Sequence, residues 1–195
     1  MNPITHCLAS WTLADRTNAG VRDRCLVTWA GVLPDVDGLG AVVDSTRSFL
    51  GMPVTAHYED YHHLLLHGLP GAIAISGLLA LVAVRRGRVF VCAFVAVHLH
   101  LLCDIAGSRG PDPGDIWPVW YLAPFSEKPV ILWAGQWPLN AWQNIAFTIA
   151  LLGYALWAAA VRGHSPVEIV SRRADPGVVA AVKARWARAR LAMGH

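Results

Sequence analysis

VHLHLLCD, residues 97–104, closes a long apolar run with two histidines and a carboxylate. On a helix His100 and Asp104 are four residues apart and share a face, where an imidazole nitrogen and a carboxylate oxygen can bind one cation. The alternative is a structural pair in which the carboxylate accepts the ring N–H of the histidine. Because an ionisable pair at the end of a membrane-length apolar segment is costly, its position favours a functional site. His98 points roughly the opposite way, and we expect it to be structural.

The composition indicates an integral membrane protein. Of the 195 residues, 55% are hydrophobic and only 15% are charged, and the mean hydropathy is +0.42, values that lie outside the usual range of soluble domains. The basic residues are clustered, a pattern that indicates membrane topology and excludes a typical nucleic-acid-binding module. The four cysteines have no CxxC spacing, so the sequence predicts neither a zinc knuckle nor a redox motif.

Three long apolar segments predict an all-α fold, a helical bundle in the membrane. Residues 68–84 and 89–105 predict a transmembrane hairpin whose tip, residues 85–88, carries three arginines. Residues 142–161 are the third predicted span, since about 20 apolar residues are needed to cross a bilayer.

The remaining segments are shorter or more polar. Residues 5–14 and 25–33 are each nearer ten residues in length, and we expect them to form a short N-terminal helical hairpin. Residues 44–61 are polar and predict a loop outside the hydrocarbon. Residues 107–140 are rich in proline, glycine and tryptophan, which is typical of a segment at the membrane interface. We expect that segment to cover the site.

The chain divides into two predicted parts. Residues 1–162 form the membrane-embedded part that carries the candidate metal site. Residues 163–195 form a cytoplasmic tail, in which apolar positions alternate with basic side chains over residues 178–193. This pattern predicts a basic amphipathic helix on an anionic membrane surface.

Two further motifs offer metal ligands. Asp35 and Asp37 lie in the sequence LPDVD, where the two carboxylates either bind a metal or belong to a turn. A second cluster contains His62, His63 and His67. If the whole cluster is helical, His63 and His67 share a face, whereas His62 and His67 can converge if the first residues belong to a loop.

The arginines predict the orientation of the bundle, because basic residues near helix ends favour the cytoplasmic side. With the arginine-rich turns and the tail on that side, the candidate ligands all lie at the opposite, extracytoplasmic ends of their segments. They are His6, Asp35, Asp37, His62, His67, His100 and Asp104. This convergence predicts one divalent-metal site on the extracytoplasmic side of the membrane.

The ordered motifs resemble the YdjM type of bacterial inner-membrane, metal-dependent hydrolases. The matching residues are His6; Leu33, Pro34, Asp35 and Asp37; His62 and His67; His100, Leu101, Leu102 and Asp104; and Ala123, Pro124 and Phe125. The resemblance favours His62 over its neighbour as the partner of His67. The family usually has arginine where this chain has His63, and serine where it has Gly68. A protonated His63 would then take the anion-binding role of that arginine.

The resemblance also implies a mechanism, with Asp35, Asp37 and His63 as catalytic residues. The ligand types are more distantly similar to the zinc-dependent phospholipase C superfamily, all-α enzymes that hydrolyse phosphoesters. In such sites metal ions lower the pKa of a bound water and polarise the phosphoryl oxygen, and an aspartate such as Asp35 can accept the water's proton. Zinc is the expected metal, and manganese or iron would also suit histidine and aspartate ligands.

Two functions from different classes follow. The first is a membrane hydrolase that cleaves a phosphoester of a membrane lipid or lipid-linked envelope intermediate. The second is a non-catalytic metal-binding or transport protein. A transporter normally has polar groups near the bilayer midplane, whereas the middles of residues 68–84 and 142–161 contain almost none. This difference favours the hydrolase.

Overall fold

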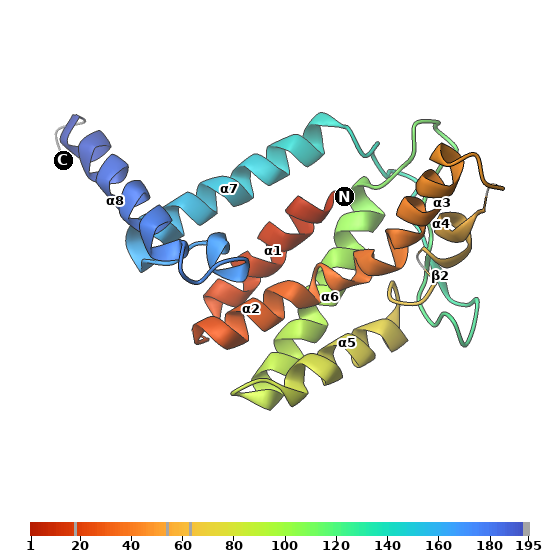
Figure 1. Cartoon of the computed structure of the whole chain (residues 1–195), viewed down its shortest axis with the longest axis horizontal. Coiled ribbons are helices and arrows are strands. Elements are labelled where there is room, and N and C mark those ends of the chain that lie inside the picture. Colours follow the sequence, from red (N-terminus) through yellow and green to blue (C-terminus); the bar gives the residue numbers. More distant parts are fainter. Residues whose placement is uncertain (18, 54, 63, 193–195) are drawn as a thin grey trace.

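The computed structural model describes residues 1–17, 19–53, 55–62 and 64–192, which fold as a helical bundle (Figure 1). In chain order the elements are α1 (Pro3–Arg16), α2 (Val21–Ala30), the 3-10 helix η1 (Leu33–Leu39), α3 (Gly40–Phe49), α4 (His57–Tyr61), α5 (Leu69–Leu81), α6 (Arg86–Gly107), β1 (Val119–Trp120), β2 (Val130–Ile131), α7 (Trp142–Arg162), the 3-10 helix η2 (Pro166–Ile169) and α8 (Asp175–Ala192). Strand structure in these residues is limited to the antiparallel pair β1 and β2. The predicted all-α class is therefore confirmed.

Small side chains build the core in which α6 packs against α1, α2 and α5. Alanines let helix backbones approach closely, which favours packing between helices in a membrane. The buried core residues are Ala14, Val27, Ala30, Ala72, Ile75, Val89, Ala93, Ala96 and Val97. A second cluster joins α1 to α7 through Leu8, Trp11, Ala155 and Ala158. The two clusters hold α1 and α6, which carry three of the candidate ligands, between their neighbours.

In the part of the chain that the structure describes, two helices, α6 and α7, are long and apolar enough to cross a membrane. With 22 residues, α6 is about 33 Å long at 1.5 Å per residue, close to the ~30 Å of a bilayer's hydrocarbon core. The predicted span at residues 68–84 forms α5, which has only 13 residues because the chain turns toward α6 after Leu81. A third span would come from α2 and the η1–α3 segment taken together, a pair bent by 45°.

The arginine-rich turns gather at one end of the bundle, which we call the basic end. It consists of the turn between α1 and α2, the turn between α5 and α6, and the C-terminal end of α7. Buried Asp15 accepts hydrogen bonds there from the Tyr154 hydroxyl at 2.5 Å and from Arg162 Nη1 at 2.9 Å. These contacts fix the end of α7 against α1, so the predicted N-terminal hairpin packs on a spanning helix.

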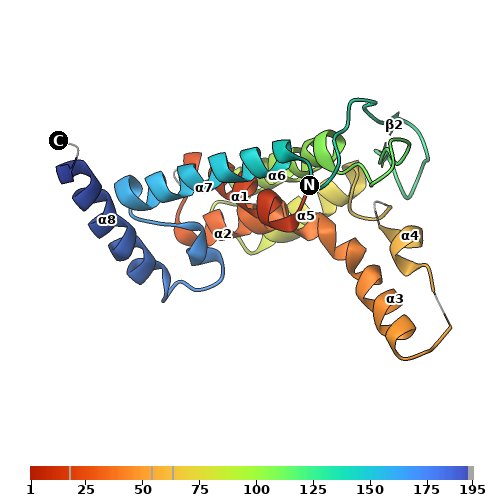
Figure 2. The ribbon, with the colours of Figure 1, turned by 90° about the horizontal axis from the view of Figure 1, so that it is seen from above.

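The region after η1 differs from the predicted loop at residues 44–61, because it contains the end of α3 and all of α4. The Asp44 carboxylate links the two helices by accepting hydrogen bonds from the Thr55 hydroxyl at 2.7 Å and the backbone N–H of Tyr58 at 2.9 Å. None of the α3 side chains is buried, and the helix projects from the bundle in Figure 2. The polar residues of this region suggested a loop, yet residues 44–49 continue helix α3.

The tail begins where α7 ends at Gly163, whose φ of 79° is left-handed and therefore favours glycine. The tail is helical over Asp175–Ala192 and packs on α7. Val179 of α8 is buried, whereas Trp186, about two turns further on, is 43% exposed. The predicted helix is present, and its position on a membrane surface stays a prediction.

Candidate metal centre

The seven candidate ligands converge at the end of the bundle opposite the basic end. They come from α1 (His6), from η1 (Asp35 and Asp37), from the segment between α4 and α5 (His62 and His67) and from α6 (His100 and Asp104). Their ligand atoms form three overlapping groups, namely His6–His100–Asp104, Asp35–His67–His100 and Asp37–His62–His67. Within each group these atoms lie within 4.8 Å of one another.

Two buried imidazoles face each other at the centre of this cluster. His67 Nε2 and His100 Nε2 are 3.1 Å apart. His100 Nδ1 lies 2.9 Å from the carbonyl oxygen of Gly31, and His67 Nδ1 lies 2.9 Å from an oxygen of Asp37. Because a carbonyl or carboxylate oxygen only accepts, each Nδ1 can donate to its oxygen, and these contacts leave the two Nε2 atoms directed toward one another. A cation placed between the two Nε2 atoms would be bound by both rings.

The Asp104 carboxylate lies beside both rings. Its Oδ2 is 3.0 Å from His100 Nε2 and 3.8 Å from His67 Nε2. Its Oδ1 is 3.1 Å from His6 Nε2 and accepts the Ser108 hydroxyl at 2.7 Å. The backbone amine of Met1 also contacts this oxygen. One oxygen of Asp104 is therefore held by hydrogen bonds while the other faces the histidine pair.

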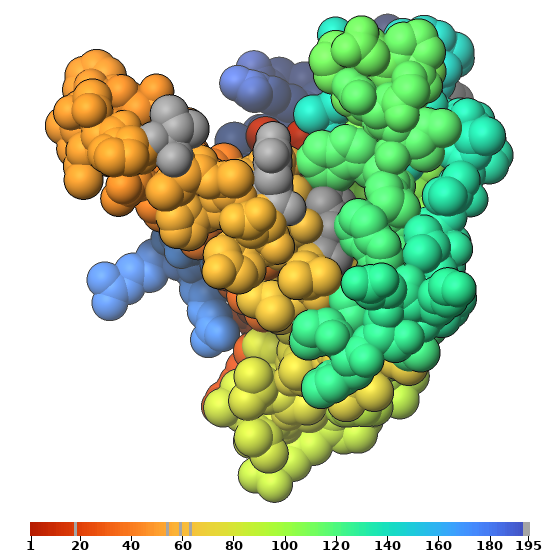
Figure 3. All heavy atoms as spheres, turned by 90° about the vertical axis from the view of Figure 1, so that its right-hand side faces the viewer, coloured from red at the N-terminus to blue at the C-terminus, as the bar shows by residue number. Residues whose placement is uncertain are grey.

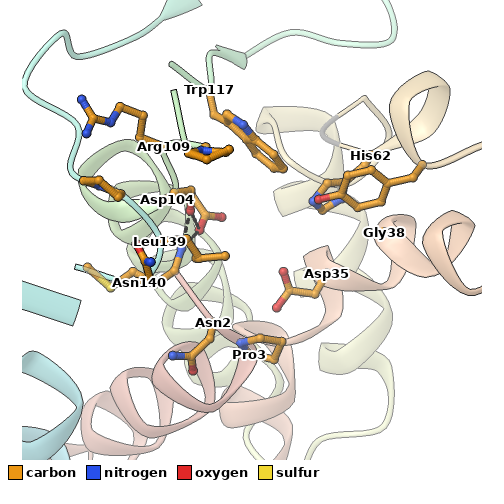
Figure 4. A pocket seen from close by; sticks show the side chains of 16 residues that line it. Asn2, Pro3, Asp35, Gly38, His62, Asp104, Arg109, Trp117, Leu139 and Asn140 are labelled. Atoms are coloured by element: carbon orange, nitrogen blue, oxygen red, sulfur yellow. Dashed lines mark hydrogen bonds and ion pairs between the residues drawn. The ribbon is translucent and has the colours of Figure 1, made fainter. Parts of the chain in front are cut away.

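Asp35 approaches the same pair from η1. Its Oδ1 is 3.8 Å from His100 Nε2, and among the described residues its buried Oδ2 has no hydrogen-bond partner. Figure 4 shows Asp35 and Asp104 facing one another across a cavity. Asp35 is thus a second carboxylate that can bind a metal or accept a proton.

Asp37 holds two histidines in place. Its oxygens accept hydrogen bonds from His62 Nδ1 at 2.8 Å and from His67 Nδ1 at 2.9 Å, and the backbone N–H of Leu66 adds a third contact at 3.3 Å. A carboxylate that binds the far nitrogen of a metal-binding histidine fixes the ring orientation and its tautomer. The geometry suits this positioning role for Asp37, and the ligand and catalytic roles that the sequence predicted for it stay predictions.

The donor set fits a divalent metal. A tetrahedral zinc ion holds histidine nitrogens at about 2.0–2.1 Å, which places two of them about 3.3 Å apart. The observed 3.1 Å between the Nε2 atoms of His67 and His100 lies close to that separation. Two imidazoles with one or two carboxylates suit zinc, manganese and iron.

The cluster opens into a cavity of about 660 Å³. Asp35, Tyr58, His62 and Asp104 line it together with the segment that follows α6, which contributes Trp117. Burial, and then the nearby carboxylates of Asp104, Asp35 and Asp37, raise the pKa of Tyr58 to about 12. The Tyr58 phenol is therefore neutral at physiological pH and can donate a hydrogen bond.

The segment between α6 and α7 is fixed to the bundle as a wall of this cavity. Buried Gln136 accepts the backbone N–H of Trp117 at 2.9 Å and donates to the carbonyl oxygens of Asp104 and Ile105 at 3.2 and 3.1 Å. Figure 3 shows this segment in green beside the orange α3–α4 region. The sequence predicted a cover at this position, and the structure places one side of the cavity there.

Other histidines are separate from the cluster or lie outside the described residues. His98 Nδ1 donates to the Phe94 carbonyl oxygen at 2.8 Å, and its Nε2 lies 3.0 Å from the Tyr121 hydroxyl, so it has the structural role that its facing predicted. His63, predicted as a catalytic residue, lies outside the described residues.

The sequence reasoning missed several groups that support the site. The carbonyl oxygen that orients His100 belongs to Gly31, where a Cβ would lie 1.7 Å from Ser10 Oγ. Close packing of α1 on the end of α2 therefore requires glycine. The position of Gly31, two residues before the motif LPDVD, is a weak sequence signal for this contact. The sequence contains no signal for the role of Gln136.

The comparisons with known proteins identify a family. A family model described as YdjM inner membrane protein matches residues 1–182, which confirms the resemblance inferred from the motifs. Neither a curated protein nor a solved structure matches the chain. The similarity to the phospholipase C superfamily stays a prediction.

Proposed function

This chain belongs to the YdjM inner membrane protein family, and on that premise we propose that it is a membrane-bound, metal-dependent hydrolase of phosphoesters. The observation that carries the proposal is the pair of Nε2 atoms of His67 and His100, 3.1 Å apart and flanked by Asp35 and Asp104 at the edge of a large cavity. A purely structural histidine pair needs neither two adjacent carboxylates nor access to a cavity.

Each residue has a distinct part in the proposed reaction. His67, His100 and Asp104 would hold the metal, which when bound lowers the pKa of water and polarises a phosphoryl oxygen. Asp35 Oδ2 accepts the proton of the attacking water, as a general base at the cavity wall. The neutral Tyr58 phenol can donate a hydrogen bond to an oxygen of the phosphoester.

The location of the cavity supports a membrane substrate. Asp104 lies within the last turn of the spanning helix α6, which corresponds to headgroup depth. Trp117 lines the cavity, and tryptophan rings are typical of this depth because one end is apolar and the other can bind water. Basic residues favour the cytoplasm, so the opposite basic end orients the site toward the extracytoplasmic side. The proposed substrate is a membrane lipid or lipid-linked intermediate.

The test is turnover by the purified full chain in nanodiscs of bacterial lipid, loaded with zinc or manganese. Release of phosphate or a phosphorylated headgroup is expected, and Asp35→Asn should lower the rate by about 10²–10⁴-fold while leaving metal bound. Asp112→Asn is the control, because it changes an exposed aspartate outside the cluster. Stoichiometric metal without turnover on phospholipids, lipid diphosphates or simple phosphodiesters would instead support a non-catalytic metal-binding or transport protein.

A further inference from the structure

A second hollow, of about 400 Å³, lies at the basic end and is unrelated to the histidine cluster. We call it the basic groove. It is built from the outer face of α2, the end of α5 and the segment that includes η2. Arg22, Leu26 and Trp29 share one face of α2 because their spacing of four and three residues follows the helical repeat. Trp29 is 43% exposed, so this face of α2 is open.

Hydrogen bonds place the groove at the end of a spanning helix. Asp23 accepts the backbone N–H groups of Val84 and Arg85 at 2.9 and 3.0 Å, directly before α6 begins at Arg86. Arg22, the neighbour of Asp23, is therefore at the level where α6 leaves the hydrocarbon. Trp29, seven residues further along α2, lies about 10 Å deeper at 1.5 Å per residue.

Among the described residues that line the groove, the one carboxylate is that of Glu168, and it is already paired. Glu168 accepts Arg24 Nε at 2.6 Å and Nη2 at 2.5 Å, and it also accepts Trp11 Nε1 at 3.1 Å. This bidentate contact neutralises Glu168 and fixes η2 against α2. Arg22 and Arg172 also line the groove, and neither has an ion pair with a carboxylate in the described part of the chain. The groove therefore has a positive polar end.

We propose that the basic groove binds one anionic phospholipid. Its phosphodiester lies between Arg22 and Arg172, since guanidinium groups bind phosphate oxygens in a bidentate way. An acyl chain lies along Leu26, Trp29 and Val82, toward the middle of the bilayer. Basic pockets of this kind between helix ends recognise anionic headgroups. A lipid fits where free phosphate does not, because apolar side chains form the deeper half of the groove.

The test is native mass spectrometry of the purified full chain with phosphatidylglycerol and phosphatidylcholine of identical acyl chains. Wild-type protein should retain one phosphatidylglycerol in preference to phosphatidylcholine. Arg22→Gln and Arg172→Gln should each weaken this retention about fivefold. Arg173→Gln is the matched control, since it removes the same charge from the next residue, which does not line the groove.

Three results would overturn the proposal. Equal retention of the two lipids by the wild-type protein would exclude a site for an anionic headgroup, and this outcome needs no variant. Equal loss in Arg173→Gln would indicate a general effect of charge. Displacement of the lipid by an equal concentration of inorganic phosphate would show that the apolar half of the groove contributes nothing.

Discussion

Replacing Asp37 with asparagine tests how the site orients its histidines. The carboxylate accepts Nδ1–H groups from both His62 and His67, whereas an asparagine side chain has one oxygen and must turn its NH₂ group toward one of them. Loss of such a partner typically costs a metal site about 10–100-fold in affinity, or about 1.4–2.7 kcal/mol. A hydrogen bond to a charged group is worth a similar amount, about 1.5–3 kcal/mol. We therefore expect Asp37→Asn to weaken zinc binding about 10–100-fold.

The assay is competition for zinc between the purified protein and a chromogenic chelator, with far-UV circular dichroism as a check on folding. Asp44→Asn is a close control, because Asp44 also accepts a histidine Nδ1, that of His57 at 3.0 Å, and a backbone N–H. It lies on α3, outside the candidate ligand groups. An unchanged affinity in Asp37→Asn, or the same loss in both variants, would refute the assignment of Asp37 as the residue that orients the ligands.

Three further predictions concern ligation, packing and topology. His100→Ala should remove most of the bound metal, whereas His98→Ala should leave the metal content nearly unchanged. Inductively coupled plasma mass spectrometry of the purified variants measures this content. Gly31→Ala should destabilise the bundle by about 1–3 kcal/mol in thermal unfolding, because its Cβ would lie 1.7 Å from Ser10 Oγ. A cysteine introduced at Gly87, in the turn between α5 and α6, should not react with an impermeant thiol reagent added from the periplasm.

Each of these predictions has an outcome that contradicts it. Equal metal loss from both histidine variants would contradict the inference that His100 faces the metal site and His98 does not. For packing the control is Gly20→Ala, whose Cβ would meet nothing within 4 Å; a loss of stability equal to that of Gly31→Ala would contradict the close contact. Periplasmic labelling at Gly87 would reverse the proposed orientation of the site.

The helix faces could be predicted because spacing alone determines them. His100 and Asp104, four residues apart, do share a face, and His98 does lie on another. The all-α class and the apolar helices follow from composition in the same way. The spacing of the second histidine cluster does not determine whether His62 or His63 lies beside His67, because this depends on where α4 ends. It ends at Tyr61, and His62 follows it in extended backbone.

Other features depend on contacts that no local pattern encodes. The backbone carbonyl oxygen of Gly31 contacts His100, and the side-chain amide of Gln136 donates to the backbone carbonyl oxygen of Asp104. Every residue has such a backbone carbonyl, so the sequence does not mark the ones that support the site. The length of α5 depends on where the chain turns toward α6, and a continuous apolar run does not mark that point. The helix in the predicted loop at residues 44–61 is stabilised by Asp44, whose partners lie up to 14 residues away.

The central claim is that His67 and His100 hold one metal ion together with Asp104. Anomalous X-ray diffraction at the zinc edge, from crystals of the zinc-loaded full chain, tests it most directly. The claim predicts an anomalous peak between the two Nε2 atoms, within bonding distance of an Asp104 oxygen. A zinc-loaded crystal whose anomalous peaks all lie elsewhere, with the two histidines still facing each other, would contradict it.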